Sequence, residues 1–104
     1  MRRIGFTMHL KPGYDEEYQR RHDEIWPELA ALLGEAGIAN YSIFLDPATR
    51  CLFAYMEVRD HYDPDWLPRQ LVMRRWWDMM GDIMDTNPDS SPVVIPLREV
   101  FHLD

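Results

Sequence analysis

The sequence of 104 residues predicts an α+β fold in which two helices cover one face of a four-stranded antiparallel sheet. Two observations lead to this prediction. Hydrophobic residues alternate with period two in four segments, and they recur every three or four residues in two longer segments. These segments follow one another as strand, helix, strand, strand, helix and strand, which is the β-α-β-β-α-β or ferredoxin-like pattern.

The first predicted strand is residues 2–10, where apolar side chains alternate with small, polar or charged ones. Pro12-Gly13 then turns the chain. From Tyr14 the apolar residues step by three or four, which predicts an amphipathic helix that runs to about Glu35. Gly37 is suited to end this helix in the left-handed conformation.

Pro27 interrupts the first predicted helix. Proline lacks an N–H and crowds the carbonyl of Asp23, so we expect the helix to kink or restart at this point. Trp26 precedes the proline and is therefore pushed away from helical angles. A bend here is consistent with side chains aimed into a cavity, and equally with a helix that curves around a core.

The central strands are residues 39–46 and 51–58, which a proline-containing turn joins into a hairpin. A loop rich in Asp and Pro leads to a second helix at about 69–84, with a wide apolar face and a charged face. The turn-rich segment 87–92 follows, where Asn and Asp residues are expected to shape turns rather than bind a ligand. Residues 96–103 alternate again and predict the closing strand.

The central strands are apolar on both sides. In residues 51–58, Leu52 and Ala54 alternate with Phe53 and Tyr55. A sheet that is apolar on both faces needs cover on both, and the two helices cover only one. We therefore expect a homodimer in which two sheets pack face to face around a cavity, as a dimeric α/β barrel.

The composition narrows the class of protein and its partners. A hydrophobic fraction of 46% supports a packed core, and a net charge of −7 argues against nucleic acid or an anionic membrane as partner. Short arginine pairs such as Arg20–Arg21 are expected on solvated helix faces. The single cysteine, Cys51, and the lack of a secretory segment favour the cytoplasm. We expect one domain over residues 1–104, with no membrane-spanning segment.

His22 lies on the apolar stripe of the first helix, where packing alone would favour Leu or Ile. A core histidine satisfied by hydrogen bonds and a general acid–base catalyst are equally consistent with this position. Tyr18 and Trp26 lie one turn before and after it. The three residues would form an apolar surface that carries a hydroxyl, an imidazole and an indole N–H, which suits a small polar ligand.

Trp76 and Trp77 form a second candidate feature on the second helix. Two tryptophans on a wide apolar face are commonly core residues, but neighbouring positions on a helix point in different directions. Flat rings beside indole N–H donors suit a sugar, and a quinone or porphyrin would also fit. Tyr41, on the hairpin, supplies another ring with a hydroxyl.

Several familiar motifs are absent. The four histidines show no H-x-x-x-H spacing and no acidic partner at ligand spacing, so we expect no metal site. There is no glycine-rich phosphate loop and no G-x-S-x-G motif. Cys51 is expected to be a small buried residue. An enzyme with this set of residues would carry out proton transfer without a cofactor.

Five blocks of the sequence carry a more specific signal: EYQRRHDEIWPEL (17–29), NYSIFL (40–45), LFAYMEV (52–58), RWWDMMGDIMDTNPDSSP (75–92) and LREVFHL (97–103). Together they resemble the L-rhamnose mutarotase family nearly from end to end. The resemblance implies a small cytoplasmic homodimer with a ferredoxin-like fold that interconverts the α and β anomers of L-rhamnose at C1. It also implies that His22 is the proton donor, and that four aromatic residues contact the sugar: Tyr18, Tyr41, Trp76 and Trp77.

The base that would accompany His22 stays open at this point. Glu57, Glu99, Asp89, His22 in a second role and a bound water are all candidates. Asn87 and Asp89 could contact sugar, although turn formation is their expected role.

Two other functions are compatible with the predicted fold. One is a cofactor-independent or haem-degrading monooxygenase built as a dimeric α/β barrel, which oxygen uptake or a bound chromophore would indicate. The other is a dimer whose cavity only binds small molecules. The fold alone does not choose among the three functions, because one scaffold hosts many activities.

Overall fold

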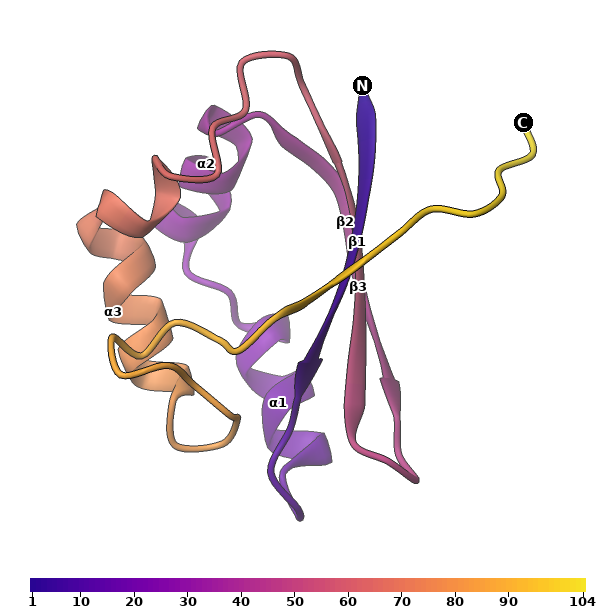
Figure 1. Cartoon of the computed structure of the whole chain (residues 1–104). Helices are drawn as coiled ribbons and strands as arrows, with labels where there is room; N and C mark the ends of the chain where they lie inside the picture. Colours follow the sequence, from indigo (N-terminus) through magenta and orange to yellow (C-terminus); the bar gives the residue numbers. More distant parts are fainter.

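A computed structural model describes residues 1–104 and contains an antiparallel sheet with helices on one side (Figure 1). The strands lie in the spatial order β2-β3-β1-β4, and their bounds are β1 Arg2–His9, β2 Ile38–Asp46, β3 Cys51–Val58 and β4 Ile95–Leu97. The helices are α1 Asp15–Asp23, α2 Pro27–Glu35 and α3 Leu71–Met80, with a short 3-10 helix, η1, at Leu67–Arg69. All strand pairs are antiparallel, which confirms the ferredoxin-like pattern.

The register of the strands divides the sheet into two faces. β1 pairs with β3 along its whole length, so that Phe6 lies opposite Ala54 and Met8 opposite Leu52. These side chains point toward the helices and form the core. The opposite side, which we call the open face, carries exposed apolar side chains from three strands: Phe44, Phe53, Tyr55, Ile95 and Leu97.

The first predicted helix is two helices in the structure. α1 ends at Asp23 and α2 begins at Pro27, so the restart that we considered is the correct alternative to a kink. Trp26 is extended, with φ −62° and ψ 132°, as expected for a residue before proline. Pro27 is the first helical residue of α2, where its missing N–H costs no helical hydrogen bond.

Gly37 ends α2 in the left-handed conformation, with φ 92°, as predicted. Its N–H donates to the carbonyl of Gly34 at 3.0 Å. A Cβ at this position would lie 3.0 Å from the imidazole of His61, so glycine is required here for space as well as for its φ angle.

The second predicted helix, 69–84, is shorter in the structure. Gln70 is extended, with φ −86° and ψ 132°, and separates η1 from α3. Ile83 and Met84 lie beyond α3 but are buried, because the chain there runs beside β1 and Met84 pairs with Leu10. None of the helices is both long and apolar enough to cross a membrane.

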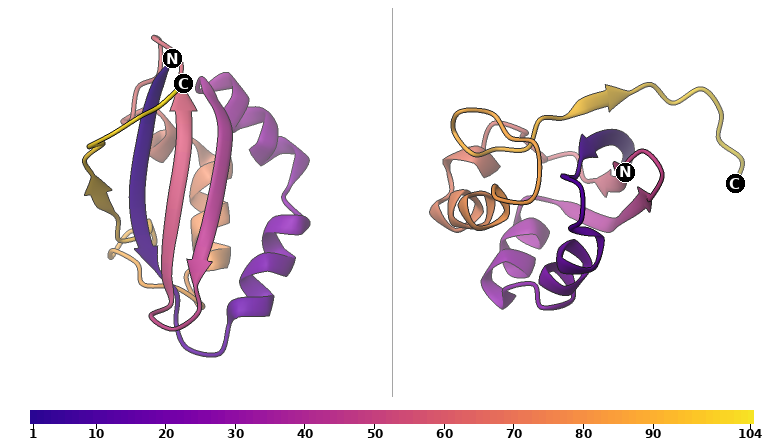
Figure 2. Two further views of the ribbon diagram at one scale, coloured as in Figure 1. Left: turned by 90° about the vertical axis from the view of Figure 1, so that its right-hand side faces the viewer. Right: turned by 90° about the horizontal axis from the view of Figure 1, so that it is seen from below.

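The closing strand is also shorter than predicted. β4 covers Ile95–Leu97, whereas the alternating pattern extended over 96–103. Residues 98–104 leave the sheet and run past it on the side away from the helices (Figures 1 and 2). The apolar side chains of this segment are 72–81% exposed: Val100, Phe101 and Leu103. The apolar side chains of an alternating strand need a surface to pack against, and no part of this chain covers those of residues 98–104.

Candidate active site

A cavity of about 960 Å³ lies between the helices and the helix-covered face of the sheet. Residues of all three helices, of β1, β2 and β3, and of the segment before β4 line it. Most of these side chains are hydrophobic, and a few polar ones lie among them. A mainly apolar cavity with a few polar groups is the usual form of a small-molecule site.

The five residues predicted to form the site all line this cavity: Tyr18, His22, Tyr41, Trp76 and Trp77. α1 contributes the first two, β2 contributes Tyr41, and α3 contributes the tryptophans. Tyr18 and Trp76 are almost fully buried, whereas Tyr41 keeps 38% of its surface exposed. The fold therefore gathers side chains that are up to 59 positions apart, from Tyr18 to Trp77, around one space.

Aromatic contacts fix the orientation of His22. Its ring stacks on Tyr18 with a centroid distance of 4.3 Å and an interplanar angle of 27°. Trp76 meets the imidazole edge to face at 5.4 Å and 89°. The helical spacing suggested that Trp26 would line the cavity next to His22, and this prediction is wrong. Since α1 ends before it, Trp26 packs instead against Trp76 at 5.2 Å and supports that ring.

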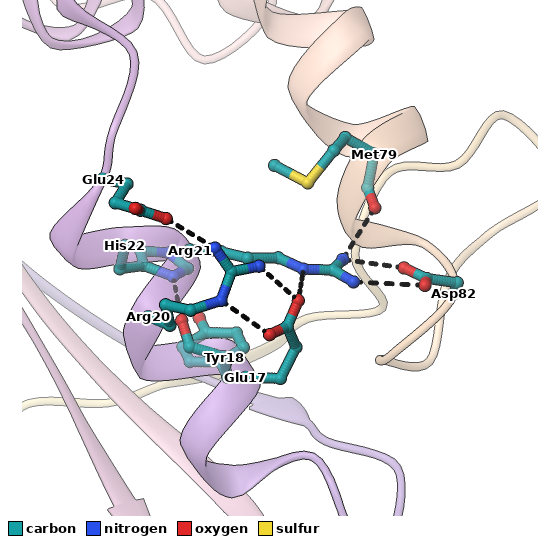
Figure 3. Close-up of polar contacts among 8 residues, drawn as sticks. All are labelled: Glu17, Tyr18, Arg20, Arg21, His22, Glu24, Met79 and Asp82. Atoms are coloured by element: carbon teal, nitrogen blue, oxygen red, sulfur yellow. Dashed lines mark hydrogen bonds and ion pairs between the residues drawn. The ribbon is translucent and has the colours of Figure 1, made fainter.

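The backbone of α1 determines the hydrogen bonding of His22. Its Nδ1 lies 3.0 Å from the carbonyl oxygen of Tyr18, one turn earlier (Figure 3). Burial lowers the pKa of the imidazole below 6.5, and the Tyr18 carbonyl and the charge of Asp23 oppose this only in part. Burial therefore favours the neutral form of His22.

The phenols at the cavity stay protonated over a wide pH range. Burial raises the pKa of Tyr18 well above its ordinary value, and the nearby Tyr41 adds to this. Tyr41 is partly exposed as a side chain, yet enough protein surrounds its hydroxyl to raise the pKa to about 12, with a further contribution from Tyr62. Both hydroxyls can thus donate and accept hydrogen bonds at neutral pH.

Arg21 connects α1 to the end of α3 (Figure 3). Its guanidinium donates to Glu17 at 2.7 Å, to Asp82 at 2.8 Å and to the carbonyl oxygen of Met79 at 2.9 Å. Only 15% of this side chain is exposed, so the expectation of a solvated position is wrong for Arg21, although it holds for Arg20. The ion pair between Glu17 and Arg21 could have been predicted from the sequence, because residues four apart on a helix are neighbours.

Further polar residues line the cavity, among them Tyr62, Asp15 and Asn87. Of these three, only Asn87 was considered from the sequence as a possible sugar contact. Tyr62 lies in the loop after β3, a segment interpreted only as a connection, and Asp15 lies at the start of α1. Asn87 both lines the cavity and shapes a turn, since its side chain donates to Ser91 Oγ at 3.1 Å. Asp89 accepts hydrogen bonds from Ser91 within the same turn and does not line the cavity.

The other carboxylates considered as the base also lie outside the cavity. Glu57 accepts hydrogen bonds from Asn40 at 2.7 Å and from Tyr55 at 2.9 Å, and Glu99 pairs with Arg3 at 2.6 Å. No group of three or more His, Cys, Asp or Glu side chains is arranged to hold a metal ion. Cys51 is only partly buried, in contrast to the expectation of a buried residue.

Comparisons with known proteins agree on one family. A family model described as L-rhamnose mutarotase matches residues 3–103. An L-rhamnose mutarotase from Acidiphilium cryptum is 58% identical over 99% of both chains, and one from Bacteroides thetaiotaomicron is 50% identical over 100% of both. The crystal structure of an L-rhamnose mutarotase from Formosa agariphila matches with a TM-score of 0.93 and 45% identity, and covers 100% of both chains.

Proposed function

The chain belongs to the L-rhamnose mutarotase family, and from this premise we infer that it is an isomerase that interconverts the α and β anomers of L-rhamnose at C1. The cavity supports this inference most directly, because it brings one imidazole, three phenols and two indoles into a single apolar space. We assign the whole chain, residues 1–104, to one mutarotase-like domain. The relatives named above give no support to the monooxygenase alternative.

In this function His22 is the catalytic residue. A pyranose exchanges anomers when its ring opens to the free aldehyde, C1 turns about the C1–C2 bond, and the ring closes on the other face. Opening needs a proton on the ring oxygen, and His22 is the titratable group held against the cavity by two aromatic rings. A positioned proton-transfer group of this kind typically accelerates a reaction by about 10²–10⁴-fold.

The aromatic residues bind the sugar. Tyr18 and Tyr41 offer neutral hydroxyls that hydrogen-bond sugar hydroxyls, because their pKa values are raised. Trp76 and Trp77 present indole rings to the apolar C–H face and the 6-methyl group. Anomer exchange moves protons and leaves the oxidation level of the sugar unchanged, so the reaction requires no redox cofactor.

We further propose that the protein is a homodimer that packs the open faces of two copies together. The open face carries five exposed apolar side chains, and Phe44 and Phe53 are 69% and 45% exposed. They stand opposite one another on paired strands and so form one continuous surface. A sheet face of this kind needs cover, and a second copy of the same face supplies it.

The C-terminal segment 98–104 supports the same dimer. It projects from β4 on the side of the sheet away from the helices (Figure 2). Its side chains Val100, Phe101 and Leu103 are all highly exposed. In a dimer these side chains would pack against the partner chain. Light scattering at micromolar concentration tests this proposal: we expect the mass of a dimer, and a monomer would contradict it.

The cytoplasm is the proposed location, supported by the single cysteine. The net charge of −7 argues against nucleic acid as a partner.

Saturation transfer between the two anomeric protons of L-rhamnose, followed by NMR, tests the proposed activity. We expect exchange above the uncatalysed rate with the wild type and little with His22→Ala. His9→Ala is a matched control, because His9 is exposed and lies outside the cavity. Unchanged exchange with His22→Ala would remove His22 from its role, and no exchange with a folded wild type would contradict the activity.

A further inference from the structure

Resting on the mutarotase function, we propose that His22 begins each turnover as a base: its Nε2 takes the proton of the anomeric hydroxyl and then passes that proton to the ring oxygen. One imidazole nitrogen would thus serve as both base and acid, and no carboxylate takes part.

The tautomer of His22 is the first support. Its Nδ1 lies 3.0 Å from the carbonyl oxygen of Tyr18. A carbonyl oxygen only accepts hydrogen bonds, so Nδ1 is the nitrogen that carries the hydrogen. In a neutral imidazole the other nitrogen, Nε2, then holds a lone pair. Such a nitrogen accepts a proton and has none to give.

The setting of the ring is the second support. Tyr18 stacks on one side of the imidazole and Trp76 meets it at 89°, so the two contacts hold the ring plane. Nε2 makes no hydrogen bond within the chain and is not enclosed by protein. Because Nδ1 faces the helix backbone and His22 lines the cavity, the free nitrogen is left for the ligand.

The protonation states of His22 and of the tyrosines at the cavity are consistent with His22 as the base. The titratable groups that line the cavity with His22 are Tyr18, Asp15 and Asp23 on α1, Tyr41 on β2 and Tyr62 in the loop after β3, while α3 contributes the uncharged Trp76, which contacts the imidazole. Burial lowers the pKa of His22, so the imidazole is neutral near pH 7. The pKa values of Tyr18, Tyr41 and Tyr62 are all raised, so none of these phenols supplies a base in that range.

The carboxylates at the cavity are poorly placed for the same task. Asp15 lies seven residues before His22, which is about 10 Å along the helix axis. Asp23 is the next residue, and its side chain is turned by about 100° around the helix from that of His22. The remaining candidates, Glu57, Glu99 and Asp89, lie outside the cavity.

The proton transfers balance without a second group. As the O1–H bond breaks, Nε2–H forms, the C1–O5 bond breaks and C1=O1 forms. Nε2–H then breaks as O5–H forms, which gives the open aldehyde and a neutral imidazole. Both oxygens are attached to C1, so one nitrogen can reach them in turn. The short-lived imidazolium keeps its Nδ1–H bond to Tyr18 and lies against the Tyr18 ring, and both contacts favour the positive charge.

The pH dependence of kcat/KM, corrected for uncatalysed exchange, tests the proposal. A base at Nε2 predicts that kcat/KM rises with pH until His22 is neutral and stays level up to about pH 9. A histidine that must start as an imidazolium predicts the reverse, because the protonated fraction falls tenfold for each pH unit above the pKa. A fall of about 100-fold between about pH 7 and 9 would overturn the proposal.

Three further experiments test the tautomer of His22 and the identity of the base separately. With ¹⁵N-labelled histidine and His22→Gln for assignment, we expect the hydrogen on Nδ1 at about pH 8; a hydrogen on Nε2 would overturn the proposal. Tyr18→Phe keeps the carbonyl and should keep both the tautomer and the shape of the pH profile. Asp15→Asn and Asp23→Asn should retain catalysis, and a loss of 100-fold or more in either would make that carboxylate the base.

The same data distinguish this proposal from the activity on which it rests. Exchange that is present but falls with pH overturns the role of Nε2 and leaves the mutarotase function intact. Absence of exchange at every pH overturns both.

Discussion

The two faces of the sheet carry side chains of similar character in different surroundings. On the side of the helices, Leu52 and Met56 are 1% and 6% exposed, whereas their neighbour Phe53 is 45% exposed on the open face. Adjacent residues of one strand thus lie in a closed core and on an uncovered surface. The comparison shows that apolar residues on both sides of a strand indicate that both faces are to be covered. They do not indicate whether helices of the same chain or a second chain will cover them.

Leu52→Ala should show the largest effect, because it removes a fully buried side chain from the covered face. The neighbouring side chains fill the space left by the leucine only in part, so we expect the free energy of unfolding to fall by about 2–5 kcal/mol. Urea unfolding followed by circular dichroism measures it. A loss well below this range would mean that the core beneath β3 is loosely packed.

Phe53→Lys places a charge on the open face one residue further along the same strand. Phe53 is 45% exposed, so each copy of a dimer would lose the burial of about half a phenylalanine side chain. The two copies together would lose about 1.5–3 kcal/mol, so the dissociation constant should rise by about 10-fold to more than about 100-fold. Sedimentation at several concentrations measures this. Ala31→Lys on the exposed side of α2 adds the same charge and should leave association unchanged. Equal effects of the two substitutions would rule out the open face as the interface.

Trp77→Ala tests the covered face as a binding site. Trp77 lines the cavity but is less buried than Trp76, which also packs against His22 and Trp26. We expect KM for L-rhamnose to rise by about 10-fold, which corresponds to about 1.4 kcal/mol, with a smaller change in kcat. Trp66→Ala removes a partly buried tryptophan that does not line the cavity, and KM should then be unchanged.

Acid should have the smallest effect, on the link between α1 and α3. Hydrogen bonds from Arg20 and Arg21 lower the pKa of Glu17 to about 2. A lowered pKa stabilises the folded state above the ordinary pKa of about 4.5, and this contribution is lost as the pH falls toward about 2. Exposure to solvent keeps it modest. Glu17→Gln should flatten the fall in unfolding free energy between about pH 5 and 3, whereas Glu16→Gln, which has no ion pair, should not.

Much of the fold could be predicted because periodicity reports which side of a segment is buried. The pattern failed where burial depends on something outside the segment. At Pro27 the sequence allowed both a kink and a restart, and in the structure α2 restarts there and contacts β2 and α3, which are distant in sequence from Pro27. At residues 98–104 the alternation indicated a buried strand without indicating which surface would bury it.

The site was predictable to the extent that its contacts are local. Tyr18 and His22 are four residues apart on one helix, and they stack as this spacing suggests. The contact between His22 and Trp76 joins residues 54 positions apart and depends on how α1 lies against α3. The same long-range packing places Arg21 against Asp82, a contact that no local pattern contains.

The edge-to-face contact of His22 with Trp76, and of Trp76 with Trp26, makes the molecule its own optical probe. A positive charge that appears on the imidazole lies beside the indole ring of Trp76 and changes its emission. A sugar that enters the cavity changes the surroundings of the same ring. We therefore expect intrinsic fluorescence to change when a sugar occupies the site and when His22 is protonated in an acid titration, with no label attached.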